Sequence, residues 1–309
     1  MLLLTGGLGF LGCNLAYYLA KQGQKLLLMQ RRISQVPSFL ESFINKDIDI
    51  VPCDILDFSN LYYVLNKYKI SSIIHMAAIY GSKGNLYQCI NVNINGTINV
   101  LEASRIMEID RITFISSHSI YQRSLEKIHR EDEDFPLKST HYISLTKKAS
   151  EMICDYVGKE YGTNILIIRP SQIYGPLYTS GLNPLQKMVE NSVVNEPTYL
   201  SEIHPDNGNN LIYVKDCVRA IGLIHLASKP QFNIYNLGDK YVTYGEMAEA
   251  IKKTIPNAEI NFRADIKKEI DEPIYLNMDR LNKEFGFKIK FNLENGIRDY
   301  IQWLRHGEY

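Results

Sequence analysis

The stretch Thr5-Gly6-Gly7-Leu8-Gly9-Phe10-Leu11-Gly12 directly follows the apolar run Met1-Leu2-Leu3-Leu4. An apolar run of this kind predicts a buried strand, and the glycines after it predict a sharp turn into a helix. Such a turn brings backbone N–H groups and the positive end of the helix dipole up to a pyrophosphate. In this context Gly6, Gly9 and Gly12 predict a dinucleotide site, whereas the simpler alternative is a tight turn that binds no ligand.

Short apolar runs alternate with longer helical patterns along the chain. Further strands are predicted at Leu26–Met29, Ile48–Val51, Ser72–His75, Arg111–Ser116 and Asn164–Arg169. Helices are predicted near Leu11–Gln22, Asn60–Lys67, Leu86–Met107, Ser144–Glu160 and Tyr244–Thr254. This alternation predicts an α/β fold with a Rossmann-type, doubly wound parallel sheet.

The pattern changes after Pro170, where prolines and polar turns break the chain into shorter pieces. Strands expected at Leu211–Val214 and Phe232–Leu237 return the chain to the main sheet. The two predicted parts are a dinucleotide-binding domain, 1–170 with 211–238, and a smaller C-terminal α/β substrate lobe, 171–210 with 239–309.

Charge and cysteine content disfavour several classes of protein, namely nucleic-acid-binding, membrane-binding, disulfide-rich and metal-binding proteins. The 309 residues carry 34 Lys+Arg and 34 Asp+Glu, a balance that favours neither nucleic acid nor an anionic membrane surface as a partner. The five cysteines are scattered and never at metal-ligand spacing, so we expect no disulfide framework and no metal. The first residues lack the pattern of a secretory leader, and no apolar run reaches membrane-spanning length. We therefore expect a cytoplasmic protein with reduced thiols.

The segment Gln30-Arg31-Arg32 bears on the choice of cofactor. An NAD site ordinarily places an acid at this strand end, where it binds the ribose 2′-hydroxyl. A carboxylate would repel a 2′-phosphate, whereas guanidinium groups form charge-assisted, often bidentate bonds to it. We therefore expect NADP in preference to NAD, and the alternative is that both arginines only solvate a loop.

Eight segments, in order along nearly the whole chain, resemble motifs of the extended short-chain dehydrogenases/reductases, the NAD-dependent epimerase/dehydratase family that acts mostly on nucleotide sugars. They are Thr5–Gly12 (TGxxGxxG), Cys53–Ile55, His75–Ala78 (HxAA), Asn93–Thr97 (NxxGT), Ile115–Tyr121, Arg169–Pro176 (RxxNVYGP), Tyr213–Asp216 (HVDD) and Tyr235–Gly238 (YNxG). Besides the residues at the ribose, the resemblance implies cofactor contacts by Gly6, Gly9, Phe10, Leu11, Asp54, Ile55, Met76, Ala77, Ala78, Lys147 and Pro170.

The resemblance also implies a tyrosine that exchanges a proton with a substrate hydroxyl, a lysine that lowers its pKa, and a serine that binds the same oxygen. Leu145–Glu151 is similar to the segment with the lysine, which makes Lys147 the expected lysine. Ile115–Tyr121 is similar to the strand that carries the serine, which makes Ser117 the expected serine. Ile143 stands at the position of the tyrosine, and isoleucine transfers no proton. On an unbroken helix the nearest phenol, Tyr142, points about 140° away from Lys147.

Two interpretations of this departure remain open. If the extra residue is absorbed at the start of the helix, Tyr142 reaches the substrate beside Ser117 and Lys147, and the protein is an NAD(P)-dependent nucleotide-sugar epimerase or reductase. If the helix already includes residue 142, the site is altered or inactive, and the protein binds NAD(P) as a sensor or as a subunit of a complex.

The substrate side departs from the pattern as well. Gln172 and Asn209 stand where the resemblance implies an asparagine and a diphosphate-binding arginine, and we expect both at the substrate together with His118. His118 and Ser119 replace the Asp-Glu pair of the related sugar 4,6-dehydratases, which disfavours dehydration. His118 or His141 is a candidate for the missing acid/base group, although a lone histidine is more often structural. A UDP- or dTDP-sugar is the expected substrate, and the resemblance implies a homodimer through the two longest predicted helices.

Overall fold

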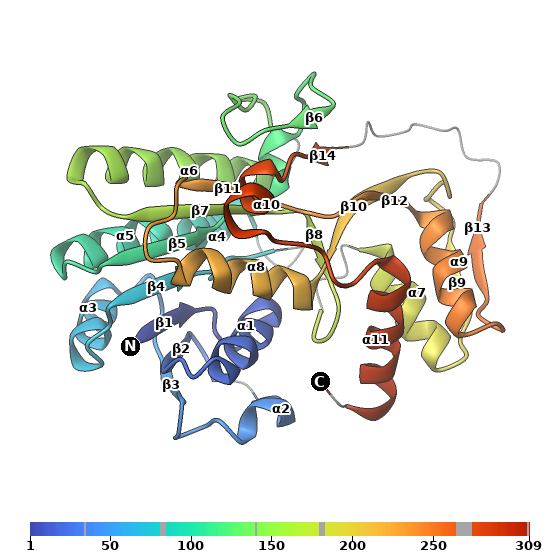
Figure 1. Ribbon diagram of the computed structural model, residues 1–309, viewed down its shortest axis with the longest axis horizontal. Helices are drawn as coiled ribbons and strands as arrows, with labels where there is room; N and C mark the ends of the chain where they lie inside the picture. Colours follow the sequence, from blue (N-terminus) through green and yellow to red (C-terminus); the bar gives the residue numbers. More distant parts are fainter. Residues whose placement is uncertain (34, 81–84, 140, 179–182, 264–273, 308) are drawn as a thin grey trace.

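The computed structural model describes residues 1–33, 35–80, 85–139, 141–178, 183–263, 274–307 and 309. Within these ranges seven parallel strands form the main sheet, in the order β11-β7-β5-β4-β1-β2-β3 (Figure 1). Their bounds are β1 Leu2–Thr5, β2 Leu26–Gln30, β3 Ile48–Pro52, β4 Ser72–His75, β5 Arg111–Ile115, β7 Ile165–Pro170 and β11 Ile234–Leu237. The strand order reverses between β1 and β4, and α/β sheets bind ligands at the carboxyl ends of strands at such a point. The predicted Rossmann-type sheet is confirmed.

Helices cover both faces of the main sheet (Figure 1). On one face lie α1 Phe10–Lys21, α2 Ser38–Glu41 and α8 Val214–Leu226, and on the other lie α3 Phe58–Lys67, α4 Leu86–Ile90, α5 Gly96–Ile106 and α6 Tyr142–Tyr161. In β1, Leu2 and Leu4 pack into the core with α1 and α8, while Leu3 packs into the core with α3 and α5. Burial on both faces explains why the strand is a continuous apolar run rather than an alternating one.

The helix predicted at Leu86–Met107 contains a π-helical turn, Asn91–Asn95, between α4 and α5. Asn93 of this turn accepts a hydrogen bond from the N–H of Ile79 at 2.7 Å and donates to Thr146 Oγ1 at 3.1 Å. The turn therefore holds the loop after β4 against α6, as π-turns near functional sites often do.

The C-terminal part of the chain forms a second group of short elements, on the right of Figure 1. Its strands and helices are β8 Gln172–Tyr174, α7 Pro184–Val193, β9 Thr198–Leu200, β10 Gly208–Tyr213, β12 Tyr241–Thr243, α9 Tyr244–Thr254, β13 Ile260–Phe262 and α11 Leu293–His306. Helix α10 Asp279–Phe285 lies instead beside β11 of the main sheet. A two-residue strand pair, β6 Ile128–His129 with β14 Tyr275–Leu276, joins this group to the loop after β5.

One expectation about this part was wrong. The strand predicted at Leu211–Val214 lies largely in β10, which pairs with β8 and β12 in a separate three-stranded sheet. The chain returns to the main sheet only with α8, which packs on α1, and with β11. Parallel pairing with β8 places the strand in this separate sheet, a long-range choice that apolar periodicity does not reveal. The predicted boundaries of the two parts remain predictions.

Candidate active site

A cavity of about 700 Å³ opens at the carboxyl ends of β1, β2, β4, β5 and β7. Its near wall consists of the glycine turn and the strand ends, and its far wall includes Asn209 of β10 and Tyr178 beyond β8. This volume lies within the range of sites for small molecules and cofactors. The cavity therefore lies between the main sheet and the C-terminal elements, at the point where the strand order reverses.

The glycine turn brings the backbone close to the cavity. Gly6 has a φ of +69°, in the left-handed region that favours glycine. A Cβ on Gly6 would lie 3.2 Å from the backbone of Ala77, and a Cβ on Gly12 would lie inside van der Waals contact with the carbonyl oxygens of Gly6 and Gly7. Helix α1 begins directly after Gly9, whose lack of a side chain leaves the first N–H groups without a side-chain cap. These groups are suited to an anionic ligand such as a pyrophosphate.

The end of β2 carries an unpaired polar atom. Gln30 Oε1 is buried and has no hydrogen-bond partner among the described residues. Arg31 and Arg32 are both exposed, and of the two only Arg31 lines the cavity. Asp54 lines the same region and accepts a hydrogen bond from the N–H of Leu56 at 2.9 Å. Since an unpaired buried oxygen is costly, Gln30 is placed to accept a hydrogen bond from a ligand hydroxyl.

A chain of buried hydrogen bonds fixes the ends of β1 and β4. Thr5 Oγ1 accepts from the N–H groups of Met76 and Ala77 at 3.1 Å each, and it lies 2.7 Å from His75 Nδ1. His75 Nε2 lies 3.0 Å from Thr97 Oγ1. Burial lowers the pKa of His75 to about 3, so the neutral ring accepts from the Thr5 hydroxyl at Nδ1 and donates to Thr97 from Nε2. The backbone after β4 is thereby held as a rigid wall of the cavity.

Ser117 and Lys147 meet at the end of β5. Lys147 is 3% exposed, and its Nζ donates to the carbonyl oxygen of Ile115 at 2.6 Å. Burial lowers the pKa of Lys147 to about 8. Ser117 Oγ accepts from the N–H of Ser119 at 3.1 Å, which leaves the Ser117 hydroxyl proton for another acceptor. Both side chains line the cavity.

These features fit a nicotinamide dinucleotide. The glycine turn and the start of α1 would hold the pyrophosphate, and Gln30 with Arg31 would hold the ribose at the adenine end. Lys147 would bind the ribose at the nicotinamide end, and the orphaned oxygen of Gln30 would gain a partner.

Helix α6 begins at Tyr142, with His141 as its N-cap. Ile143 is 6% exposed and lines the cavity one helical turn before Lys147, whereas Tyr142 is not among the lining residues. The Tyr142 hydroxyl is buried without a hydrogen-bond partner among the described residues, and burial raises its pKa. This is the helix start that the second interpretation of the sequence assumes, and any role of Tyr142 in catalysis stays a prediction.

His118 follows Ser117 and also lines the cavity. Its Nδ1 lies 3.2 Å from the carbonyl oxygen of Pro170. A carbonyl oxygen only accepts, so Nδ1 carries the proton and Nε2 carries the lone pair in the neutral ring. Burial lowers the pKa of His118 to about 4, which keeps the ring neutral near pH 7.

The substrate side of the cavity is polar but uncharged. Gln172 and Asn209 line it, and Asn209 Nδ2 donates to the Tyr244 hydroxyl at 2.8 Å. Ser119 and Ser171 also line the cavity. Their hydroxyl oxygens are buried and have no hydrogen-bond partner in the described part of the chain. Such unpaired groups suit a ligand that carries several hydroxyls.

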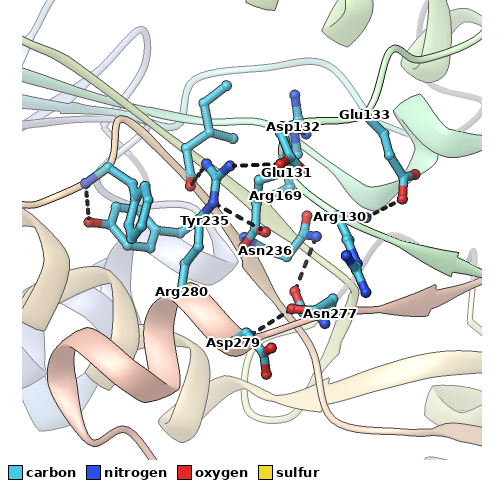
Figure 2. Close-up of polar contacts among 12 residues, drawn as sticks. Arg130, Glu131, Asp132, Glu133, Arg169, Tyr235, Asn236, Asn277, Asp279 and Arg280 are labelled. Carbon is cyan, nitrogen blue, oxygen red and sulfur yellow. Dashed lines mark hydrogen bonds and ion pairs between the residues drawn. The ribbon is translucent and has the colours of Figure 1, made fainter.

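Buried charges lie behind the cavity wall, and Figure 2 shows the contacts around Glu131. Arg169 of β7 is 2% exposed, pairs with Glu151 of α6 at 2.7 Å and donates to the carbonyl oxygen of Glu131 at 3.2 Å. The Glu131 carboxylate accepts from the N–H of Asn236 at 2.9 Å and lies 3.6 Å from Nε of Arg280 in α10. This cluster ties α6 and β7, which carry cavity residues, to β11 and α10.

Most of the predicted site residues meet in the cavity. The predicted cofactor residues that line it are Gly6, Gly9, Phe10, Leu11, Gln30, Arg31, Asp54, Ile55, Met76, Ala77, Ala78, Lys147 and Pro170. The predicted substrate residues that line it are His118, Gln172 and Asn209. Arg32 and Tyr142 are the two predicted residues that do not line it.

Two lining tyrosines were missed from the sequence. Tyr80 lies two residues beyond the HxAA-like segment, and Tyr178 lies two residues beyond the RxxNVYGP-like segment. Their closeness to motifs that end at the cavity is the signal that would have identified them.

The described ranges hold neither a metal-ligand cluster nor a helix that could span a membrane. There, no group of three His, Cys, Asp or Glu side chains is placed to hold a metal ion. In the same part of the chain, no helix has both the length and the apolar character needed to cross a bilayer. The five cysteines are buried free thiols.

Comparison with known proteins gives consistent matches. Residues 2–238 match the family model described as NAD dependent epimerase/dehydratase family. The chain is 23% identical to UDP-glucuronate 4-epimerase of Thermodesulfobacterium geofontis, over 99% of this chain and 96% of that protein. Its fold is similar to UDP-glucose 4-epimerase of Thermotoga maritima solved with UDP-glucose, with a TM-score of 0.85, 19% identity and 99% of each chain covered. It is also similar to UDP-glucose 4-epimerase of Thermus thermophilus in complex with NAD, with a TM-score of 0.83, 21% identity and 99% of each chain covered.

Proposed function

The chain belongs to the NAD-dependent epimerase/dehydratase family, and from this premise we propose that it is an NAD(P)-dependent nucleotide-sugar epimerase or reductase. The observation that carries the proposal is the single cavity that contains Ser117, Lys147 and the glycine turn. A nicotinamide dinucleotide bound there supplies hydride transfer. Ser117 would hydrogen-bond the reacting oxygen of the sugar, and Lys147 would hold the nicotinamide ribose and orient it.

The proposed cofactor is NADP in preference to NAD. Arg31 supports this choice because it lines the cavity next to Gln30, and a guanidinium binds a 2′-phosphate through charge-assisted bonds. Gln30 carries no charge that would repel that phosphate. Arg32 has no part in the proposal, since it lies outside the lining.

The proposed substrate is a UDP- or dTDP-sugar. The relatives named above act on UDP-sugars by their names, and the unpaired hydroxyls of Ser119 and Ser171 suit the hydroxyls of a hexose. Gln172 and Asn209 would donate hydrogen bonds to the diphosphate as neutral amides, which bind phosphate more weakly than arginine does.

The proposed oligomer is a homodimer, and the proposed location is the cytoplasm. Free, buried thiols suit a reducing compartment. The dimer would form through helices α4, α5 and α6, which carry several exposed apolar side chains. These are Leu86, Tyr87, Ile98, Ile106, Leu145, Met152, Tyr156 and Tyr161.

A second candidate function has its own supporting observation. Ile143 lines the cavity where the resemblance implies the tyrosine, and Tyr142 does not line it. A protein that binds NAD(P) without turnover, as a sensor or a subunit of a complex, needs no proton-transferring tyrosine.

Turnover assays separate the two candidates. The purified protein is incubated with NAD⁺ or NADP⁺ and a panel of UDP- and dTDP-hexoses, and absorbance at 340 nm and the sugar products are followed. We expect conversion of at least one sugar, with roughly 100-fold slower turnover in Ser117→Ala and Lys147→Met. Cofactor binding without conversion of any sugar would support the second candidate. Full activity in both variants would refute the roles proposed for Ser117 and Lys147.

A further inference from the structure

We infer that Nε2 of His118 takes the proton of the reacting substrate hydroxyl, in place of the tyrosine hydroxyl that this chain lacks at position 143. The inference rests on the proposed function, since it names the proton acceptor of that reaction. It makes His118 a catalytic residue, next in sequence to Ser117, which would bind the same oxygen.

The ring of His118 is fixed by the cavity wall. Its Nδ1–H donates to the carbonyl oxygen of Pro170 at 3.2 Å, so the proton of the neutral ring is held on the side away from a ligand. Nε2 makes no hydrogen bond to any described residue, and His118 lines the cavity. The hydrogen bond thus selects the tautomer in which Nε2 is an acceptor, because the partner of one ring nitrogen commonly decides which nitrogen carries the proton.

The other candidate groups in the wall are less suited to accept a proton. Ile143 is apolar, and Tyr142 is absent from the lining. The phenol of Tyr80 lines the cavity, but burial raises its pKa, so it keeps its proton rather than exchanging it.

His141 also lines the cavity, but both of its ring nitrogens have partners. Its Nδ1 accepts from the N–H of Ser144 at 3.3 Å as the N-cap of α6, and its Nε2 lies 3.1 Å from Nε2 of Gln122. His118 is therefore the histidine whose second nitrogen is available to a substrate.

Proton and electron balance is complete with this group. When a secondary alcohol of the sugar is oxidised, its C–H electron pair leaves as hydride for the nicotinamide dinucleotide, its O–H proton passes to Nε2, and a C=O bond forms. The resulting imidazolium still donates from Nδ1 to Pro170, which stabilises the positive charge. On return of the hydride, the same proton moves from Nε2 back to the oxygen.

The electrostatic surroundings set the pH range of this role. Burial lowers the pKa of His118 to about 4, and the nearby His141 and His129 lower it as well. The ring is thus neutral, with the lone pair of Nε2 free, at any pH well above 4, and it loses that lone pair to protonation as the pH falls towards 4.

The experiment compares His118→Asn with His306→Asn, an exposed histidine on α11 that serves as the control. The asparagine amide keeps a donor towards Pro170 but has no basic nitrogen. We expect His118→Asn to slow hydride transfer from the sugar by roughly 100-fold or more, with the Kd for NADP(H) within about twofold of the unmodified protein. His306→Asn should retain full activity. A rate for His118→Asn within about threefold of the unmodified protein, or loss of turnover in Tyr142→Phe alone, would overturn the inference.

A second readout does not depend on turnover. In protein labelled with ¹⁵N-histidine, NMR should show His118 in the Nδ1–H form, and its Nε2 signal should shift when UDP-glucose or dTDP-glucose is added to the complex with NADPH. An Nε2–H form, or an unmoved signal with both sugars bound, would overturn the inference. If no sugar is converted but the signal shifts, the proposed function and the catalytic role of His118 both fail, and His118 is left as a residue that contacts the bound sugar.

Discussion

At the residue scale, burial lowers the pKa values of three basic side chains of the site. It lowers the pKa of His75 to about 3, of His118 to about 4 and of Lys147 to about 8, because each charged form loses its hydration. Near pH 7 both histidines are therefore neutral, whereas Lys147, which lines the cavity with Ser117, is mostly protonated. With so few charges in the wall, replacement of one residue should change one contact with a ligand rather than the whole site.

The two arginines after β2 provide a matched pair of variants. Arg31→Ala should weaken the binding of NADP(H) about tenfold, because it removes a charge-assisted bond to the 2′-phosphate from a solvent-exposed side chain. The Kd for NAD(H) should stay within about twofold, and Arg32→Ala should leave both unchanged, since Arg32 does not line the cavity. Fluorescence titration with the reduced nucleotides measures these constants. Equal affinity of the unmodified protein for NADP(H) and NAD(H) would contradict the preference.

A buried histidine outside the site makes stability depend on pH. His225 of α8 is 3% exposed and lies 2.8 Å from Thr113 Oγ1 and 3.1 Å from Ser72 Oγ. Burial lowers its pKa from 6.5 to about 3, so below pH 6.5 the unfolded chain binds a proton that the folded chain does not. The contribution is complete above pH 6.5 and falls by about 1.4 kcal/mol per pH unit on acidification towards pH 3.

Urea unfolding at pH 7.5, 6.5, 5.5 and 5.0 tests this dependence. His225→Gln should make the free energy of unfolding less dependent on pH below 6.5 by about 1.4 kcal/mol per unit. The exposed His306→Gln should leave the dependence unchanged. The same slope in the unmodified protein and in His225→Gln would refute the prediction.

At the scale of elements, the local sequence pattern predicts which strands exist, but it does not predict where a helix begins or becomes irregular. The five strands predicted from Leu26 to Arg169 are confirmed within one or two residues, because parallel strands buried on both faces are continuous apolar runs. The π-turn at Asn91–Asn95 was not predicted, because apolar periodicity does not distinguish it from α-helix and the contacts of its Asn93, to Ile79 and Thr146, come from other parts of the chain. The start of α6 at Tyr142 was likewise left open, since a helix terminus is set by its cap and its neighbours.

Replacing two helical glycines by alanine should change the free energy of unfolding in opposite directions. In α5, a Cβ on Gly96 would lie inside van der Waals contact with the side chain of Ile55, which lines the cavity. Gly96→Ala should therefore lower the free energy of unfolding by about 1–3 kcal/mol and weaken cofactor binding. In α6, a Cβ on Gly158 would meet its nearest atom, the carbonyl oxygen of Thr163, at an ordinary 3.5 Å.

Gly158→Ala should consequently stabilise the protein by about 0.5–1 kcal/mol through helix propensity alone. Urea unfolding and cofactor titration of both variants provide the measurements. A destabilised Gly158→Ala, or a Gly96→Ala protein with unchanged stability and cofactor affinity, would contradict the packing described for these helices.

At the scale of the whole molecule, the fold was predictable and part of the assembly of the site was not. Most residues predicted for the site line one cavity, because several of the motifs directly follow strands whose carboxyl ends meet at the same edge of the main sheet. The pairing of β10 with β8, and the place of Tyr178 in the wall, depend on how the C-terminal elements pack on the main sheet. No local periodicity encodes that packing. The hydrogen bond from His118 to Pro170 joins residues 52 positions apart, so it could not be predicted from the sequence either.

The proposed dimer gives a prediction for the complete particle. Light scattering at micromolar concentration should report twice the chain mass of 35.5 kDa. Met152→Lys should produce a monomer, because it places a charge on the exposed apolar face of α6, where Met152 is 58% exposed. Tyr199→Lys on β9, also exposed but far from these helices, should leave the dimer intact. A mass of 35.5 kDa for the unmodified protein would exclude the dimer.

The buried amine of Lys147 is a reactive nucleophile inside the cavity. With a pKa of about 8, roughly half of the Lys147 amines are unprotonated, and hence nucleophilic, at pH 8. An exposed lysine with a pKa near 10.4 is less than about 1% unprotonated at that pH. A nucleotide reagent that carries an aldehyde on its nicotinamide-side ribose would thus be delivered to an amine that is far more nucleophilic at pH 8 than an ordinary exposed lysine. The cavity is therefore suited to covalent affinity labelling, with Lys147 as the point of attachment.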